Sequence, residues 1–159
     1  MEEKVRTKNF IITVIFIVCF FVFFKPLLVR QIILRGDGYL GFNMNYDAIR
    51  QYNKALLLEP KNINAKSWLA YAYKRTGQTE KAVKAYEDSL RLTPNNIIAY
   101  YELGMVYAMR KDFAVAKTYF LKASSLPKEY AVTGDEDYDF YHKGSLKMLN
   151  FCRERLGEN

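Results

Sequence analysis

The sequence is poor in the side chains that build metal sites and catalytic sites. Its 159 residues contain a single histidine, His142, and two cysteines, Cys19 and Cys152. Two cysteines and one histidine do not make a typical structural zinc site at usable spacing. Cys19 lies in an apolar run and Cys152 near the C-terminus, so we expect no structural disulfide. No serine or cysteine is placed by a recognisable motif to act as a nucleophile with His142.

Phosphate-binding glycine loops and supported pairs of catalytic carboxylates are missing as well. Asp135, Asp137 and Asp139 imitate the start of a calcium loop. However, Phe140 stands where that loop needs glycine, and Leu146 stands where it needs a bidentate glutamate. We therefore expect a protein that is not an enzyme and uses no cofactor or metal.

The charge balance is basic but mild. Lys and Arg number 24 against 17 Asp and Glu, a net charge of +7. Such a balance would suit nucleic acid, anionic lipid or an acidic partner. The lysines are dispersed among acidic residues, as at Lys54, Lys61, Lys81, Lys84, Lys117 and Lys122. Dispersed lysines are typical of a solvated face, so we expect no nucleic-acid binding and keep a basic binding surface as the less favoured alternative.

Residues 10–24 form one long hydrophobic run, FIITVIFIVCFFVFF, without a charge. As a helix this run covers about 22 Å, short of the roughly 30 Å hydrocarbon core of a bilayer. Extension through Val29 predicts a transmembrane helix at 10–29 that follows a short basic tail at 1–9. Lys25 would then reach from the edge of the span to the headgroups.

Two other interpretations of this run are less favoured. A cleaved signal peptide needs small residues at its cleavage site, whereas FFKPLLVRQ follows the run. A buried core helix would need a polar face. Basic residues flank the run on both sides, at Lys4, Arg6 and Lys8 and at Lys25, Arg30 and Arg35, so they do not set its orientation. The α-amino charge favours an inside tail and a soluble part on the extracytoplasmic side of a bacterial inner membrane; the cytosolic side of an organelle membrane is the alternative.

The rest of the chain repeats with a period of about 34 residues. YDAIRQYNKALLLEP at 46–60 and EKAVKAYEDSLRLTP at 80–94 share this register, and FAVAKTYFLKASSLP at 113–127 follows it closely. In each segment the apolar residues recur at i, i+4 and i+7, which predicts a helix that proline then ends. Asn62 and Asn96 are suited to cap the next helix, which carries an apolar stripe of its own, and Gly77 marks a turn.

A helix–turn–helix unit of about 34 residues resembles the tetratricopeptide repeat family. The resemblance is carried by Leu69, Ala70, Tyr73, Gly77, Ala82, Tyr86 and Pro94, and by Leu103, Gly104, Tyr107, Ala116, Phe120 and Ala123. It implies an all-α solenoid in which a small residue of one helix receives the aromatic ring of its neighbour.

The resemblance suggests an order of segments along the chain. A membrane-proximal partial repeat at 30–62 precedes repeats at 63–96 and 97–128, an acidic loop at 129–137 and a C-terminal capping helix at 138–157. The first repeat is expected to be partial because three glycines weaken its first helix. We expect the membrane helix to continue into this segment, with a flexible joint as an alternative.

The resemblance also implies a concave groove that holds an extended peptide or a partner helix. At about 100° per residue, the face away from the core stripe predicts groove residues Asn64, Ser67, Tyr71, Lys74 and Arg75, and in the next unit Ile98, Tyr101, Met105 and Met109. Tyrosine and methionine suit an adaptable binding surface. The alternative is that the two methionines pack against the capping helix.

Chaperone-binding members of the family clamp a terminal carboxylate with lysines and asparagines, and Ser67 and Tyr71 occupy two of those places, so this clamp is not expected. We predict a membrane-anchored scaffold or adaptor that binds a protein partner. An accessory subunit of a larger membrane or envelope complex is the alternative.

Overall fold

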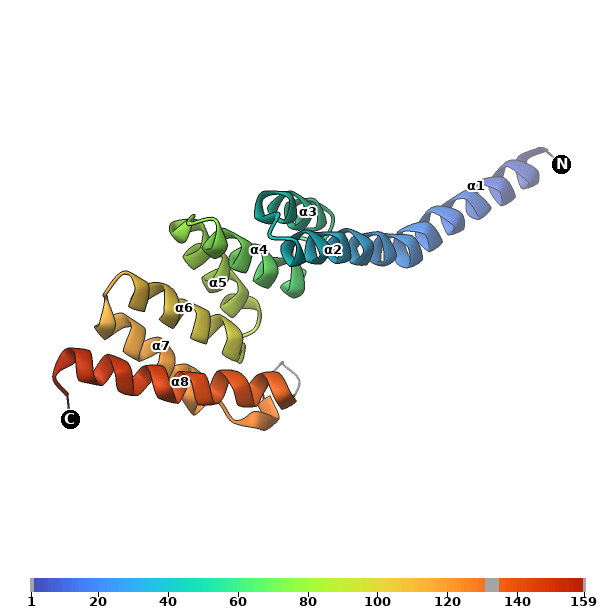
Figure 1. Cartoon of the computed structure of the whole chain (residues 1–159). Coiled ribbons are helices and arrows are strands. Elements are labelled where there is room, and N and C mark those ends of the chain that lie inside the picture. Colours follow the sequence, from blue (N-terminus) through green and yellow to red (C-terminus); the bar gives the residue numbers. More distant parts are fainter. Residues whose placement is uncertain (1, 131–134, 159) are drawn as a thin grey trace.

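A computed structural model describes residues 2–130 and 135–158, and over these residues the chain is an all-α solenoid from which one long helix projects (Figure 1). The elements are α1 (Glu2–Cys19), a π-helical segment (Phe20–Phe24), α2 (Lys25–Gly41), α3 (Asn45–Leu58), α4 (Ile63–Arg75), α5 (Thr79–Leu92), α6 (Ile97–Met109), α7 (Phe113–Ser125), a 3₁₀ turn (Lys128–Tyr130) and α8 (Asp135–Leu156). Helices α2 and α3, α4 and α5, and α6 and α7 form successive antiparallel pairs, and α8 packs on the last pair.

The projecting helix runs without a break into the solenoid. Figure 1 shows α1 extending away from the other helices, whereas α2 lies against α3. Among the described residues, one helix is long and apolar enough to cross a membrane, and it covers Arg6–Gly41. Val29, however, is 1% exposed and packs with Ala55 and Ala65 in the solenoid. The predicted span at 10–29 is therefore too long at its end, because Val29 belongs to the protein core.

Helix α2 is a packed member of the first helix pair. Gly36 and Gly104 occupy the same position of the repeat, two periods apart, and each meets an aromatic ring. A methyl group on Gly36 would lie 2.6 Å from Cε1 of Tyr52, and one on Gly104 would lie 2.7 Å from Cε1 of Phe120. Glycine at 36 is thus required for close packing, and the expectation of a partial first repeat is corrected to a complete helix pair. The helix does continue from the apolar run into this segment, as expected, so the alternative of a flexible joint is not supported.

The turn inside each pair uses a left-handed residue at the same register. Asn43, Gly77 and Lys111 have φ values of 60°, 72° and 63°. In each turn, the amide of the residue after the left-handed one donates a hydrogen bond to the carbonyl five residues earlier. The Gln78 amide, for example, donates to the Tyr73 carbonyl at 2.9 Å. This is the Schellman end of a helix, which usually takes glycine. Of these three turns only the middle one has glycine, at Gly77, so only that turn could be recognised from the sequence.

The predicted N-caps are confirmed. The side-chain oxygen of Asn62 accepts from the Ala65 amide at 3.0 Å, and that of Asn96 accepts from the Ala99 amide at 3.1 Å. Each cap satisfies an amide that has no partner within its own helix. These caps fix where α4 and α6, which carry most of the predicted groove residues, begin.

The C-terminal region differs from the predicted acidic loop. Part of that loop, 131–134, lies outside the described residues. Residues 128–130 form a 3₁₀ turn, and α8 begins at Asp135, so the capping helix starts three residues earlier than predicted. Asp135, Asp137 and Asp139 accordingly belong to a helix, whose geometry is not that of a calcium loop.

Candidate protein-binding groove

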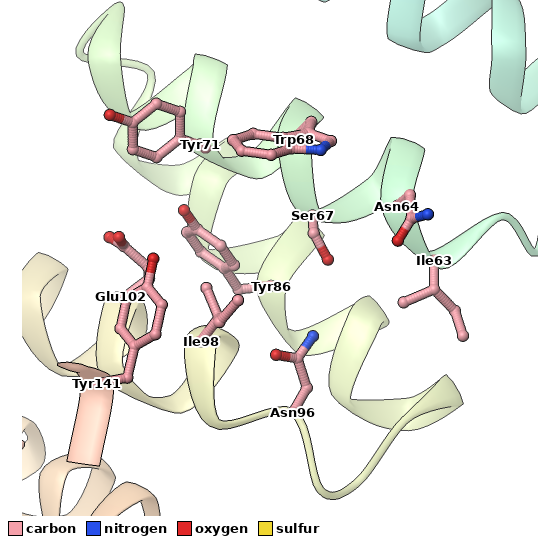
Figure 2. Close-up of a pocket in the computed structure, with 10 residues that line it drawn as sticks. All are labelled: Ile63, Asn64, Ser67, Trp68, Tyr71, Tyr86, Asn96, Ile98, Glu102 and Tyr141. Carbon is pink, nitrogen blue, oxygen red and sulfur yellow. The ribbon is translucent and has the colours of Figure 1, made fainter. Parts of the chain in front are cut away.

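A cavity of about 350 Å³ opens between α4, α6 and α8 (Figure 2). It is lined by Ile63, Asn64, Ser67, Trp68, Tyr71, Tyr86, Asn96, Ile98, Glu102 and Tyr141. A second cavity of about 410 Å³ lies between α2 and the start of α4 and shares Asn64 and Trp68 with the first. The hollow therefore continues along the solenoid from α8 to the helix that carries the apolar segment.

Equivalent positions of the repeat line this hollow. Asn64 and Ile98 are one period apart, as are Trp68 and Glu102, and all four line the cavity. One period earlier, Leu34 lines the second cavity. The first helix of each pair therefore turns the same face to the hollow, and the side chains on that face change from unit to unit.

Aromatic rings form much of the cavity wall. Figure 2 shows Trp68 and Tyr71 on α4 facing Tyr86 and Tyr141 across the opening. The rings of Trp68 and Tyr71 meet edge to face, with centroids 6.0 Å apart. Trp68 remains 44% exposed, which is high for the one tryptophan of the chain. Large rings that stay accessible in a concavity are typical anchors for a partner side chain.

A buried ion pair closes one side of the cavity. Glu102 is 6% exposed and accepts a hydrogen bond from the Lys74 ammonium group. The same ammonium group lies 4.8 Å from the centre of the Tyr71 ring. Because a buried carboxylate needs a partner, the contact with Lys74 stabilises the Glu102 side chain within the wall.

The hydroxyl group of Tyr86 has unused hydrogen-bonding capacity, and that of Tyr141 lies in the same cavity wall. Tyr86 is 1% exposed, and its Oη has no hydrogen-bond partner among the described residues. Burial, followed by the charge of Glu102, raises the pKa of Tyr86 above its usual value. The same two causes raise the pKa of Tyr141 to about 12. Both hydroxyl groups therefore stay protonated at neutral pH, and a buried O–H without a partner favours a ligand that brings an acceptor.

Four of the nine predicted groove residues line the cavity: Asn64, Ser67, Tyr71 and Ile98. Lys74 borders it through the Glu102 pair. Arg75 instead donates to Asn43 and to the Leu40 carbonyl, and so ties the second helix pair to the first. These cations are held by the chain itself, not left open on a groove edge.

The other three predicted residues do not line the cavity. The ring of Tyr101 lies 5.8 Å from that of Phe120 and 5.3 Å from that of Tyr141, centre to centre. Met105 packs into the cluster formed with α8, as the alternative interpretation expected of it. Met109 is 73% exposed and lies outside the cavity lining.

Sequence reasoning did not assign to the groove six of the residues that line the cavity: Ile63, Trp68, Tyr86, Asn96, Glu102 and Tyr141. Trp68 was detectable, since Asn64, Trp68 and Tyr71 have i, i+4 and i+7 spacing on one helix face. Glu102 was detectable as the residue one period after Trp68. Tyr86 was predicted as core, and its ring is in the core, but its hydroxyl reaches the cavity. Tyr141 depends on how α8 folds back, which a repeat pattern does not predict.

Comparison with known proteins agrees with this geometry. Residues 70–110 match the TPR repeat family, and residues 97–130 match the tetratricopeptide repeat family. The chain contains tetratricopeptide repeats. A TPR repeat-containing protein of Methanocaldococcus jannaschii is 30% identical in an alignment 131 positions long, which covers 74% of this chain and 23% of that protein. The chain thus spans about a quarter of the length of this relative.

Solved structures share the fold at low sequence identity. The chaperone SycD of Yersinia enterocolitica, in complex with a peptide of the translocator YopD, has a TM-score of 0.72 and 12% identity, over 80% of this chain and 94% of that one. The TPR domain of Sgt2 from Aspergillus fumigatus has a TM-score of 0.67 and 22% identity, over 81% and 79%. These similarities establish the tetratricopeptide solenoid.

Proposed function

We propose that this protein is a membrane-anchored scaffold whose concave cavity binds an extended segment of a partner protein. The observation that carries the proposal is the cavity of about 350 Å³ with accessible aromatic walls and a buried, unpartnered Tyr86 hydroxyl. A peptide backbone or side chain offers the acceptor that this hydroxyl lacks. The similar fold of SycD, which is solved with a peptide of its translocator, supports a polypeptide as the ligand.

A role in binding, not catalysis, accounts for the chemistry of the cavity. Its charged carboxylate, Glu102, is held by Lys74 in an ion pair. Its hydroxyl groups belong to tyrosines whose pKa values are raised, so at neutral pH they are protonated and poorly nucleophilic. Such groups position a ligand without activating it.

The anchor is proposed to be the apolar part of α1 and the π-helical segment, ending by Leu28. Residues 10–24 carry no charge, and their large side chains are exposed throughout. We place the solenoid on the extracytoplasmic side, with the basic tail inside. Protease digestion of sealed membrane vesicles tests on which side of the membrane the solenoid lies. Without detergent, the protease degrades the solenoid only if it lies on the outer surface of the vesicle.

Substitution of accessible cavity residues tests partner binding. Trp68→Glu and Asn64→Lys introduce charge at exposed positions of the wall, so the fold should persist. Met109→Glu is the matched control, since Met109 is exposed on α6 outside the cavity. We expect the first two variants, purified from native membranes in mild detergent, to lose the partners that co-purify with the wild type. Retention of those partners at unchanged helicity would exclude the cavity as the binding site.

A further inference from the structure

The end of the solenoid nearest the anchor carries an exposed leucine where the other units have polar residues. Leu57, in the last turn of α3, is 82% exposed. One and two periods later the same position holds Arg91 and Ser125. The repeat itself therefore does not require an apolar side chain at this position. The apolar side chain at this exposed position is specific to the unit nearest the apolar run.

The turn that follows Leu57 lies beside the end of the apolar run. Lys25, the first charged residue after that run, lines one surface hollow together with Pro60 and Lys61 of the turn between α3 and α4. Because Lys25 is the charged residue that ends the uncharged run, this turn lies at the level of the proposed bilayer surface. Figure 1 shows the same arrangement, with the first helix pair at the base of the projecting helix.

The length of the apolar run brings the surface closer still. Residues 10–24 cover about 22 Å as a helix, against a hydrocarbon core of roughly 30 Å. Extension to Leu28 reaches about 28 Å but draws Lys25 into the headgroup layer, and the run cannot lengthen further because Val29 is buried against Ala55. A short span is accommodated when flanking residues are drawn toward the bilayer or the bilayer thins. Either change moves the turn after α3 into the headgroup layer.

The charges around Leu57 match an anionic surface. Lys54 lies one helical turn before Leu57, Lys61 lies four residues after it, and both are exposed. Together with Lys25 they outnumber Glu59, the acidic residue of the turn, whose carboxylate accepts from the Asn62 side chain at 2.9 Å. An exposed leucine flanked by lysines is typical of a segment that inserts into lipid headgroups.

We infer that the turn from Leu57 to Lys61 is a lipid-binding surface, in which Leu57 inserts among the acyl chains and the lysines contact the phosphates of anionic phospholipids. The inference rests on the membrane anchor of the proposed function. It adds that the solenoid is held at two points, through α2 and through this turn. The cavity between α2 and α4 consequently opens close to the membrane surface.

Single-tryptophan variants test the lipid contact. In the full-length chain with Trp68→Phe, a new tryptophan is placed by Leu57→Trp at the turn, by Phe16→Trp in the proposed span, or by Met109→Trp far from both. Each protein is reconstituted in vesicles of phosphatidylcholine and phosphatidylglycerol whose acyl chains carry bromine both close to the headgroups and near the chain ends. Bromine quenches tryptophan only on contact. We expect the tryptophans at 16 and 57 to lose most of their fluorescence and the one at 109 to lose little.

The outcomes separate the inference from the anchor. Quenching at 16 with none at 57 beyond that at 109 would overturn the lipid-binding turn and leave the anchor standing. No quenching at 16 would remove the anchor and the inference with it. The double substitution Lys54→Glu, Lys61→Glu, added to Leu57→Trp, should reduce quenching at 57. Equal quenching with and without phosphatidylglycerol would contradict the role assigned to the lysines.

Discussion

Two alanine substitutions in α2 test whether this helix, which continues from the apolar run, is part of the solenoid. Gly36→Ala places a methyl group 2.6 Å from Cε1 of Tyr52. That ring cannot retreat easily, because Tyr52 is fully buried and its hydroxyl donates to Asp37 at 2.7 Å. Gly38→Ala is the matched control, since a methyl group there meets no atom within 4 Å.

The size of the effect follows from two opposing contributions. Alanine in place of glycine inside a helix stabilises by about 1 kcal/mol, and both variants gain this. Overpacking against a buried ring costs about 1–3 kcal/mol, and only Gly36→Ala incurs this cost. The difference between the variants therefore isolates the steric contribution, about 1–3 kcal/mol in favour of Gly38→Ala.

Unfolding of the full-length protein in detergent micelles measures that difference. Circular dichroism follows helix loss, and the fluorescence of the single tryptophan, Trp68, follows the solenoid. For a chain of this size, about 1 kcal/mol shifts the midpoint of thermal unfolding by roughly 2–4 °C. A Gly36→Ala protein that melts at or above the temperature of Gly38→Ala would show that α2 does not pack on α3 as described.

Three further predictions concern turns, the buried ion pair and alkaline pH. Lys111→Gly should stabilise by about 0.5–1 kcal/mol and Gly77→Ala should destabilise by about 1 kcal/mol, because both positions are left-handed; denaturant titration with equal midpoints would contradict this. Lys74→Met should destabilise by roughly 3 kcal/mol by leaving Glu102 buried without its partner, and adding Glu102→Gln should restore much of the loss in the same titration. The pKa of Tyr141 is raised from its usual 10 to about 12, so its contribution to stability is complete below pH 10 and is lost as pH rises through 12. Helicity measured over this range should fall less steeply in Tyr141→Phe, and an unchanged profile would argue against its burial.

Much of the fold was predictable from the sequence because a repeat exposes its own register. Alanine and aromatic positions recurring once in every period predicted the helix pairs, and Asn62 and Asn96 predicted two helix starts. The weak point was glycine. Gly36 was interpreted as a residue that weakens α2, because helix propensity considers only the helix itself. In the structure the ring of Tyr52 packs so close that only glycine, without a side chain, fits there.

The cavity was predictable only in part. Residues on one face of α4, such as Asn64 and Tyr71, follow from helical geometry. Tyr101 and Met105 lie on the corresponding face of α6, but α8 packs against them. The path of that final helix depends on long-range packing. The position of Tyr141 in the cavity wall depends on that path and therefore did not follow from the repeat pattern.

Site-specific photo-crosslinking tests most directly the claim that this cavity binds a polypeptide. A photoreactive phenylalanine analogue is placed at Trp68 or Ile98, which line the cavity, and at Met109, which is exposed outside it. In native membranes, we expect positions 68 and 98 to give the same protein adduct and position 109 to give none. Adducts at 109 alone, or none at 68 and 98, would contradict a polypeptide-binding cavity.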